Sequence, residues 1–245
     1  AQALPVPTDP AMALEQARRL LASGSPAEAA QLLAGALGAP DPAQRLEARL
    51  LLARATLERG DAHVALELAA ETAQRAADQR AAGMAAVIAA RALASLGERE
   101  QASEQLRVAA HLLPELAPYL EYRTLDLLAG TGREAEAEQL VDQIVTTAPI
   151  RRLAVAALEW RKTRAEQRGD FPAVREAVTR LLELATIPSY RATLLVQRAR
   201  AARELGDVPA AQPDLLMAIE TAPESAAAAQ ALDELDALGA GSTVS

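Results

Sequence analysis

Seven glycines divide this 245-residue chain into segments of nearly equal length. They lie 33 to 37 residues apart, and each follows a run of helix-forming residues such as EARLLLARATLERG. The seven are Gly24, Gly60, Gly97, Gly132, Gly169, Gly206 and Gly239. A glycine at that point supplies the left-handed residue that ends a helix without a steric penalty. A fixed period of this length predicts an array of stacked structural repeats.

Small residues keep the same register as the glycines. One set lies five residues after a glycine and consists of Ala29, Ala65, Ala102, Ala137 and Ala211, with Val174 in the remaining repeat. A second set lies seven residues before a glycine and consists of Ala17, Ala53, Ala90 and Ala199. Small side chains at fixed points on two helices let the helix axes approach closely. The pattern therefore predicts antiparallel helix pairs that pack through these alanines.

Cap and stop residues also follow the period. Asp61, Asp170 and Asp207 come directly after their glycines, where a carboxylate can cap the next helix. Seventeen residues after a glycine, three units carry a proline, which ends the preceding helix. These prolines are Pro114, Pro149 and Pro223.

The predicted fold is all-α: a right-handed α-solenoid of about six helical hairpins plus a terminal helix. About two fifths of the residues are alanine or leucine and 2% are aromatic, which disfavours a sheet. We expect first helices at 10–23, 42–59, 80–96, 115–129, 151–168 and 189–205, and the terminal helix at 224–238. We expect second helices at 26–37, 62–76, 99–112, 133–147, 171–185 and 208–221. Residues 10–239 form one predicted domain, with a linker or processed N-terminus at 1–9 and a flexible tail at 240–245.

Composition excludes several classes of function. The chain has no cysteine, so disulfides, thiolate metal sites and cysteine nucleophiles are impossible. Its net charge of −8 disfavours binding to nucleic acid. The longest apolar stretch, 81–90, is about half the length that a membrane-spanning helix needs, so we expect no membrane span. His63 and His111 lie on different repeats, and no catalytic constellation is visible, so we expect no metal, no cofactor and no enzyme within this chain.

Four arginines form what we call the arginine ladder, each six residues before its glycine. They are Arg18, Arg54, Arg91 and Arg200; the fourth and fifth repeats carry Asp126 and Thr163 instead. Equivalent positions of stacked repeats share one face, where guanidinium groups suit carboxylates or phosphates of a ligand in a concave groove. The favoured alternative is that each arginine pairs with an acidic neighbour such as Glu47, Glu58 or Glu204.

The second candidate surface is aromatic. The aromatic residues concentrate in one part of the chain and are Tyr119, Tyr122, Trp160, Phe171 and Tyr190. Tyr and Trp are common anchors of binding surfaces, and Trp160 lies beside Arg161 and Arg164. We favour the interpretation that the rings fill a core otherwise built from small residues. The local run of basic residues between Arg151 and Arg168 indicates a solvated helix face, because Glu159 and Glu166 are interleaved with it; the alternative is contact with an anionic polymer such as a carboxylated glycan–peptide.

The unit of Gly, then Asp, Arg or Ser, an alanine five residues after the glycine, a Leu/Ala helix and a proline resembles the tetratricopeptide (TPR) repeat. The stretches LAPYLEYRTLDLLAGTGREAEAEQLVDQI and LLVQRARAARELGDVPAAQPDLLMAIETAPESAAAAQALDEL also resemble the superhelical region that precedes the catalytic domain of soluble lytic transglycosylases. That resemblance implies a non-catalytic, extracytoplasmic scaffold that positions murein or partner proteins. The family's catalytic glutamate has no match, because Pro223-Glu224-Ser225 lacks the Gly-rich segment that follows it in the family. We interpret Glu224 as a charge in the first turn of a helix.

An alternative function stays open. The chain can be an independent TPR-type adaptor that binds a partner peptide in its concave groove, with a cytoplasmic location in place of the periplasm or cell envelope. The expected partner is a protein or peptide in both cases, and peptidoglycan in the first.

Overall fold

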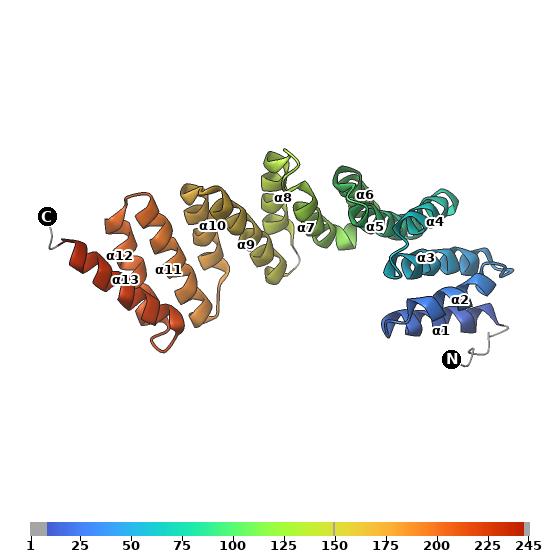
Figure 1. The fold of residues 1–245 in the computed structure, drawn as a ribbon, viewed down its shortest axis with the longest axis horizontal. Helices are drawn as coiled ribbons and strands as arrows, with labels where there is room; N and C mark the ends of the chain where they lie inside the picture. Colours follow the sequence, from blue (N-terminus) through green and yellow to red (C-terminus); the bar gives the residue numbers. More distant parts are fainter. Residues whose placement is uncertain (1–8, 149, 243–245) are drawn as a thin grey trace. The chain divides into compact units, whose positions relative to one another are not determined.

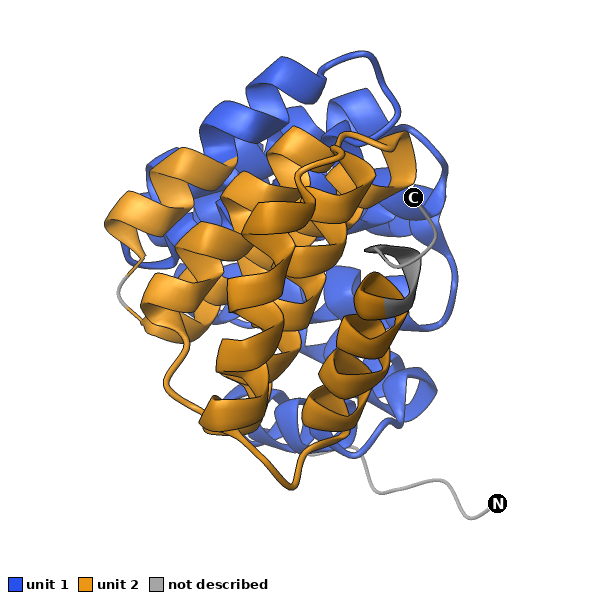
Figure 2. Cartoon of the chain, turned by 90° about the vertical axis from the view of Figure 1, so that its left-hand side faces the viewer, with its two compact units in different colours: residues 1–140 blue, residues 141–245 orange. Residues whose placement is uncertain are grey.

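The computed structural model describes residues 9–148 and 150–242, and every regular element in these ranges is a helix (Figure 1). The chain divides into two compact units, residues 1–140 and 141–245, which we call unit 1 and unit 2 (Figure 2). The boundary falls inside a helix, and the single domain expected over 10–239 stays a prediction. The linker expected at 1–9 falls almost wholly outside the described residues, as do the last three residues of the expected tail.

Helices follow one another through both units. Unit 1 contains α1 (Pro10–Ala22), α2 (Pro26–Ala36), α3 (Pro42–Glu58), α4 (Ala62–Arg75), α5 (Gln79–Ser95), α6 (Arg99–Leu112), the short 3-10 helix η1 (Pro114–Leu116) and α7 (Ala117–Leu128). The unit boundary lies within α8 (Glu134–Thr147). Unit 2 contains α9 (Arg151–Arg168), α10 (Phe171–Leu184), α11 (Pro188–Glu204), α12 (Val208–Thr221) and α13 (Ala226–Ser242). No helix in 9–148 or 150–242 is both long and apolar enough to span a bilayer.

The glycine period predicted these helices well. Every expected range except the last agrees with the structure within two residues at both ends. The reason is local, because six of the seven glycines have φ between 67° and 93°, a region that side chains with a Cβ rarely occupy. Gly239 is the exception and the prediction there is wrong: α13 continues through it to Ser242. A glycine lowers the stability of a helix but ends it only where the chain also turns. Within the described residues, no turn into another helix follows Gly239.

The in-phase small residues form the core of the repeats. Both sets are at most 3% exposed, which confirms them as helix contacts. In unit 1 each helix from α1 to α7 packs on the next, and among the first helices α3 also packs on both α1 and α5. In unit 2 the helices from α9 to α13 pack in the same order, and α11 also packs on α13. This arrangement of stacked hairpins confirms the α-solenoid.

The expected caps are confirmed in part. Asp170 and Asp207 each accept a hydrogen bond from a backbone amide of the following helix, at 3.2 Å. Asp61 lies at the cap of α4 without such a bond, and its carboxylate lies 3.6 Å from Arg59 instead. Pro114 begins η1 after α6 ends, and Pro223 follows α12, as predicted. The third proline, at position 149, lies outside the described residues.

Candidate functional site

The first arginine of the ladder joins two neighbouring first helices of unit 1. Arg18 on α1 forms ion pairs with Glu15 on the same helix, at 3.2 Å, and with Glu47 on α3. The bond to Glu47 is the chief reason that the pKa of Arg18 is raised above its ordinary value. The ion pair with Glu47 is the one expected under the structural interpretation. It ties one repeat to the next.

Two further ladder arginines also hold carboxylates. Nε of Arg54 donates to Glu58 at 2.8 Å, one turn along α3. In unit 2, Nε of Arg200 donates to Glu234 of α13 at 2.6 Å, whereas the sequence suggested Glu204. The sequence could not favour Glu234, because that partner comes from the next repeat rather than from the arginine's own helix. These arginines serve contacts within and between repeats.

The remaining ladder arginine, Arg91, lines a hollow in unit 1 that we call the α5/α7 hollow. Its volume is about 150 Å³. It is lined by Val87, Ala90, Arg91 and Ala94 of α5, Leu106 of α6, and Leu120, Arg123, Asp126 and Leu127 of α7. Sites for cofactors and drug-sized ligands are usually at least about 300 Å³. The α5/α7 hollow therefore has room for a single side chain rather than for a cofactor.

Charged residues surround this apolar floor. Arg91, Arg123 and Asp126 are exposed at its edge. Among the described residues of unit 1, no ion pair holds the guanidinium group of Arg91 or Arg123, in contrast to the other ladder arginines. Tyr119 lies one turn before Arg123 on α7, on the same helix face, and is 41% exposed. The hollow thus contains one residue of the arginine ladder, Arg91, and Tyr119 of the aromatic group lies beside Arg123 on α7 without lining the hollow.

Arg123 lines the hollow but is not among the site residues predicted from the sequence. Arg123 does not belong to the arginines that recur at a fixed distance from the glycines, so the glycine period gave no reason to select it. The available signal was its spacing, because Arg123 lies four residues after Tyr119 and three before Asp126. Those spacings place the three side chains on one face of a helix.

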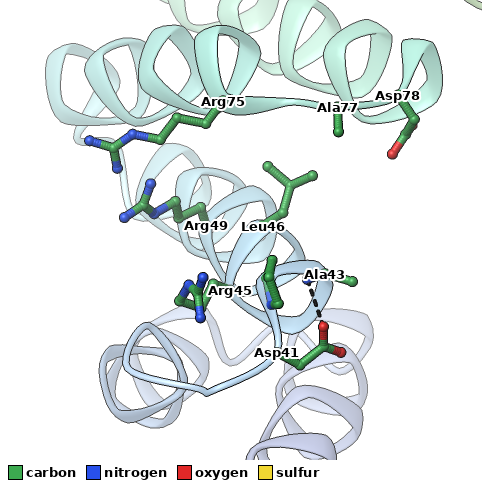
Figure 3. Close-up of a pocket in the computed structure, with 9 residues that line it drawn as sticks. Asp41, Ala43, Arg45, Leu46, Arg49, Arg75, Ala77 and Asp78 are labelled. Carbon is green, nitrogen blue, oxygen red and sulfur yellow. Dashed lines mark hydrogen bonds between the residues drawn. The ribbon is translucent and has the colours of Figure 1, made fainter.

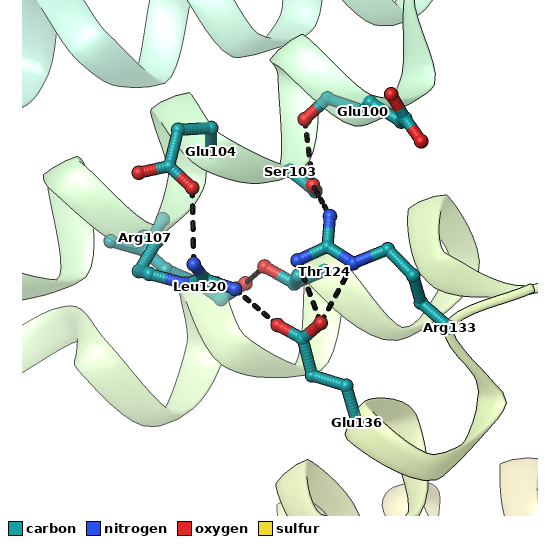
Figure 4. Close-up of polar contacts among 8 residues, drawn as sticks. All are labelled: Glu100, Ser103, Glu104, Arg107, Leu120, Thr124, Arg133 and Glu136. Carbon is teal, nitrogen blue, oxygen red and sulfur yellow. Dashed lines mark hydrogen bonds and ion pairs between the residues drawn. The ribbon is translucent and has the colours of Figure 1, made fainter. Parts of the chain in front are cut away.

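A polar network holds the helix that supplies Leu106 in place (Figure 4). Arg107 of α6 forms ion pairs with Glu104, at 3.1 Å, and with Glu136 of α8. Arg133 donates to the same Glu136 at 2.8 Å and to the buried Ser103 of α6 at 3.2 Å (Figure 4). These bonds fix α6 against the start of α8. The chain's own contacts therefore position the base of the α5/α7 hollow, without a ligand.

The other aromatic candidates are half-buried. Tyr122 lies within unit 1, whereas Trp160, Phe171 and Tyr190 belong to unit 2. The guanidinium carbon of Arg164 lies 5.6 Å from the centre of the Trp160 ring, a cation–π contact within α9. This contact of the Trp160 ring is thus made with a residue of its own helix.

The solvated face expected for the basic run of α9 is wrong at two positions. Arg161 and Lys162 are each only 7% exposed. Arg161 donates to Asp142 at 3.1 Å, and Arg180 donates to the same carboxylate oxygen at 2.6 Å. The hydrogen bond from Arg161 is the main cause that lowers the pKa of Asp142. A buried cation needs such a partner, and here the carboxylate comes from a different helix.

Lys162 belongs to a second buried polar group in unit 2. Its Nζ lies 2.7 Å from the Glu159 carboxylate and donates to Gln197 of α11 at 3.0 Å. The hydroxyl of Tyr190 donates to Glu159 at 2.5 Å, and burial is the main cause that raises the pKa of Tyr190. Lys162 occupies the position seven residues before its glycine, which is alanine in four other repeats. This departure from the repeat was the signal that could have predicted its burial.

A metal ion in a protein is usually held by several His, Asp or Glu side chains that converge on one point. In the described part of the chain, no three such side chains lie close enough together to form such a group. The charged clusters observed there join arginines or Lys162 to carboxylates instead.

No protein-family model matches this sequence, and no curated protein matches it. Several solved structures are similar. A tetratricopeptide repeat protein from Parabacteroides merdae has a TM-score of 0.59 at 17% identity, over 86% of this chain and 79% of that one. The apo form of the quorum sensor NprR from B. thuringiensis has a TM-score of 0.56 at 14% identity, over 94% and 69%. The pilF protein of Pseudomonas aeruginosa has a TM-score of 0.55 at 15% identity, over 92% and 97%.

These likenesses, together with the stacked hairpins, define the class of the protein as an all-α, TPR-like helical repeat. At such low identity they describe the fold alone, since one fold carries many functions. None of these three structures is described as a lytic transglycosylase. The resemblance of the second half of the chain to that family therefore stays a prediction from the sequence.

Proposed function

We propose that this chain is a non-catalytic interaction scaffold that binds a peptide segment of a partner protein over the α5/α7 hollow. The observation that carries the proposal is the placement of Arg91 and Arg123, held by no ion pair in the described residues of unit 1, around an apolar floor of limited volume. An apolar side chain of the peptide fills the hollow. A neighbouring Asp or Glu of the peptide accepts hydrogen bonds from the two arginines.

The energetics of such a site favour selectivity. The floor is apolar, and a fully buried Leu or Ile side chain contributes about 1.5–3 kcal/mol. A hydrogen bond to a charged group contributes about 1.5–3 kcal/mol more where water is excluded. Asp126 at the same edge repels a second acidic residue there and favours a polar or basic one. The expected ligand is therefore a segment with one apolar anchor flanked by an acidic residue.

Selection from a random peptide library displayed on phage, with the full chain immobilised, tests the proposal. We expect the enriched peptides to share an apolar residue next to Asp or Glu. The double variant Arg91→Ala, Arg123→Ala should bind the selected peptides roughly tenfold to a hundredfold more weakly. Arg152→Ala, at an exposed arginine of unit 2, is the matched control and should bind as the original chain does. Equal binding by the double variant and the control contradicts the proposal.

The cell-wall role is a narrower form of the same proposal, and only the sequence resemblance supports it. In that form the partner belongs to the cell envelope, the chain is extracytoplasmic, and peptidoglycan is a second ligand. Cosedimentation of the full chain with purified murein sacculi tests this form, and chain that stays in the supernatant contradicts it. Release of muropeptides in the same incubation would contradict the non-catalytic assignment.

A further inference from the structure

A second cleft in unit 1 lies where α3 begins and α4 ends (Figure 3). Its volume is about 570 Å³, several times that of the α5/α7 hollow. Its wall is formed by the first two turns of α3, by Arg75 at the end of α4, and by Ala77 and Asp78 in the link to α5. We call it the α3/α4 cleft.

Three arginines line one side of the α3/α4 cleft. Figure 3 shows Arg45, Arg49 and Arg75 one above another, with their guanidinium groups on the same side of the cleft. Arg45 and Arg49 are one turn apart on α3, a spacing at which like charges repel. Gathering three cations is unfavourable in itself, and it occurs here in a chain with a net charge of −8.

Internal contacts account for only part of this arrangement. The guanidinium group of Arg45 donates to the carbonyl oxygens of Ala39 and Pro40, each at 2.7 Å. Arg75 lies 3.5 Å from Glu71, and both side chains are more than half exposed. Among the described residues of unit 1, no ion pair holds Arg49.

The repeat pattern does not require these arginines either. Arg45 has an equivalent in Arg191 of the sixth repeat, which also donates to backbone carbonyls near the end of the preceding helix. The positions equivalent to Arg49 in the other repeats hold Ala13, Ala86, Glu121, Leu158 and Leu195. The positions equivalent to Arg75 hold Ala39, Leu112, Thr147, Leu184 and Thr221. Packing of the solenoid therefore accounts for Arg45 but not for Arg49 and Arg75.

The two acidic residues of the cleft are engaged by helix ends. One carboxylate oxygen of Asp41 accepts a hydrogen bond from the amide of Ala43 at 3.0 Å (Figure 3). One carboxylate oxygen of Asp78 accepts from the amide of Ala81 at 2.7 Å. Each carboxylate thus faces the positive end of a helix, which offsets its charge. The side of the cleft formed by the arginines keeps an excess of positive charge.

We propose that the α3/α4 cleft is a separate binding site for an acidic peptide segment, with carboxylate or phosphate groups against Arg49 and Arg75 and apolar groups against Leu46 and Ala77. Guanidinium groups form paired hydrogen bonds with both kinds of oxyanion, so glutamate and phosphoserine are two sources of one chemistry. The cleft is large enough for several residues of an extended chain. This site does not rest on the function proposed for the α5/α7 hollow.

Titration of the full chain, labelled with ¹⁵N in its arginines, tests the site through the side-chain Nε–H signals in NMR spectra. The probes are three capped pentapeptides: Ala-Glu-Leu-Glu-Ala, Ala-phosphoserine-Leu-Glu-Ala, and the neutral Ala-Gln-Leu-Gln-Ala. We expect the first two to shift the signals of Arg49 and Arg75 with saturation, and the neutral peptide to shift neither. Binding by the phosphopeptide alone identifies phosphate as the recognised group and also supports the site.

Matched variants test whether Arg49 and Arg75 themselves hold the peptide. Arg49→Gln with Arg75→Gln should weaken binding of the acidic peptide roughly tenfold, as followed at the Nε–H signal of Arg45 in the same cleft, while far-UV circular dichroism stays unchanged. Arg152→Gln should leave the affinity as it was. Arg91→Ala with Arg123→Ala should leave the titration of the Arg49 and Arg75 signals unchanged, because these signals report on the α3/α4 cleft alone, so failure of one site does not imply failure of the other. Equal affinity for the neutral peptide, or no effect of the Arg49 and Arg75 substitutions, overturns the proposal.

Discussion

Gly83 occupies a buried position of α5 that has no room for a methyl group. A Cβ added there would lie 2.6 Å from Cγ of Leu113 and 3.0 Å from both of its Cδ atoms. Leu113 caps the end of α6 and is 2% exposed. The nearest atom is the branch carbon of the leucine rather than the end of a flexible chain. Leu113 therefore cannot yield to a methyl group without displacing its other neighbours.

Two opposing effects decide the outcome of Gly83→Ala. Alanine is more favourable than glycine inside a helix by about 1 kcal/mol. Extra volume in a packed core costs about 1–3 kcal/mol. We expect the packing cost to prevail, so that Gly83→Ala lowers the free energy of unfolding by about 1 kcal/mol. Gly239→Ala is the control, because that glycine lies in α13 with nothing within 4 Å of the added Cβ, and its helix should gain up to about 1 kcal/mol.

A double-mutant cycle isolates the contact with Leu113. Leu113→Ala alone should cost about 2–5 kcal/mol, since it leaves a cavity. In that background the methyl group at position 83 enters free space, and Gly83→Ala should become stabilising. The coupling energy between the two substitutions is then about 1–3 kcal/mol in favour of the double variant.

Equilibrium unfolding in urea measures these values. Far-UV circular dichroism follows the helices of the whole chain, and fluorescence of Trp160, the single tryptophan, follows unit 2 separately. If Gly83→Ala stabilises the chain as Gly239→Ala does, or if its effect is the same with and without Leu113, the steric reasoning is refuted.

Three further predictions concern contacts that the repeats use. Gly169→Ala should lower the free energy of unfolding by about 1–2 kcal/mol, because φ there is 67° and nothing crowds the added Cβ; urea unfolding measures it, and no loss would contradict the backbone argument. Arg191→Ala should cost about 1–3 kcal/mol, since it removes donors to the carbonyls of Leu182 and Ala185, and Arg191→Lys should restore only part of the loss. Asp142→Asn should destabilise unit 2 at neutral pH, because the buried Arg161 then faces a neutral amide in place of the Asp142 carboxylate. The pKa of Asp142 is lowered in the folded chain, so its contribution is present above about pH 4 and is lost as the pH falls through the folded value. The midpoint temperature of thermal unfolding of unit 2 should therefore fall less between pH 7 and pH 2 in Asp142→Asn than in the original chain. Identical pH profiles of the two midpoints would contradict the assignment.

The helices were predictable from the sequence because their ends are decided locally. A left-handed glycine, an aspartate cap and a small residue in register act within a few positions of one another, as at Gly169, Asp170 and the following helix. Gly239 shows the limit of this reasoning. Its sequence neighbourhood resembles the others, but the described chain does not turn there into another helix.

The candidate sites were less predictable because they depend on contacts between distant residues. The sequence shows that Arg161 and Lys162 are charged, and charge ordinarily indicates a surface. Their burial depends on Asp142 of α8 and Gln197 of α11, which no local pattern connects to them. The α5/α7 hollow likewise depends on Arg91 of α5 and Arg123 of α7, which line it from two different helices. The repeat register predicted Arg91 as a candidate site residue, but it gave no reason to select Arg123.

Arginine supplies every basic residue of this chain except Lys162, and many of the arginines have a structural task. Arg18 and Arg200 join successive first helices, Arg45 and Arg191 bind carbonyl oxygens near helix ends, and Arg107 with Arg133 fixes α6 to α8. A guanidinium group suits these tasks because it offers several donors in a rigid plane. The exceptions are informative for the same reason. Arg49, Arg91 and Arg123 are among the arginines that no ion pair holds in the described part of unit 1, and each lines one of the two cavities described above. In a chain that uses its arginines for internal contacts, the arginines left at cavities are the residues where a ligand is expected to bind.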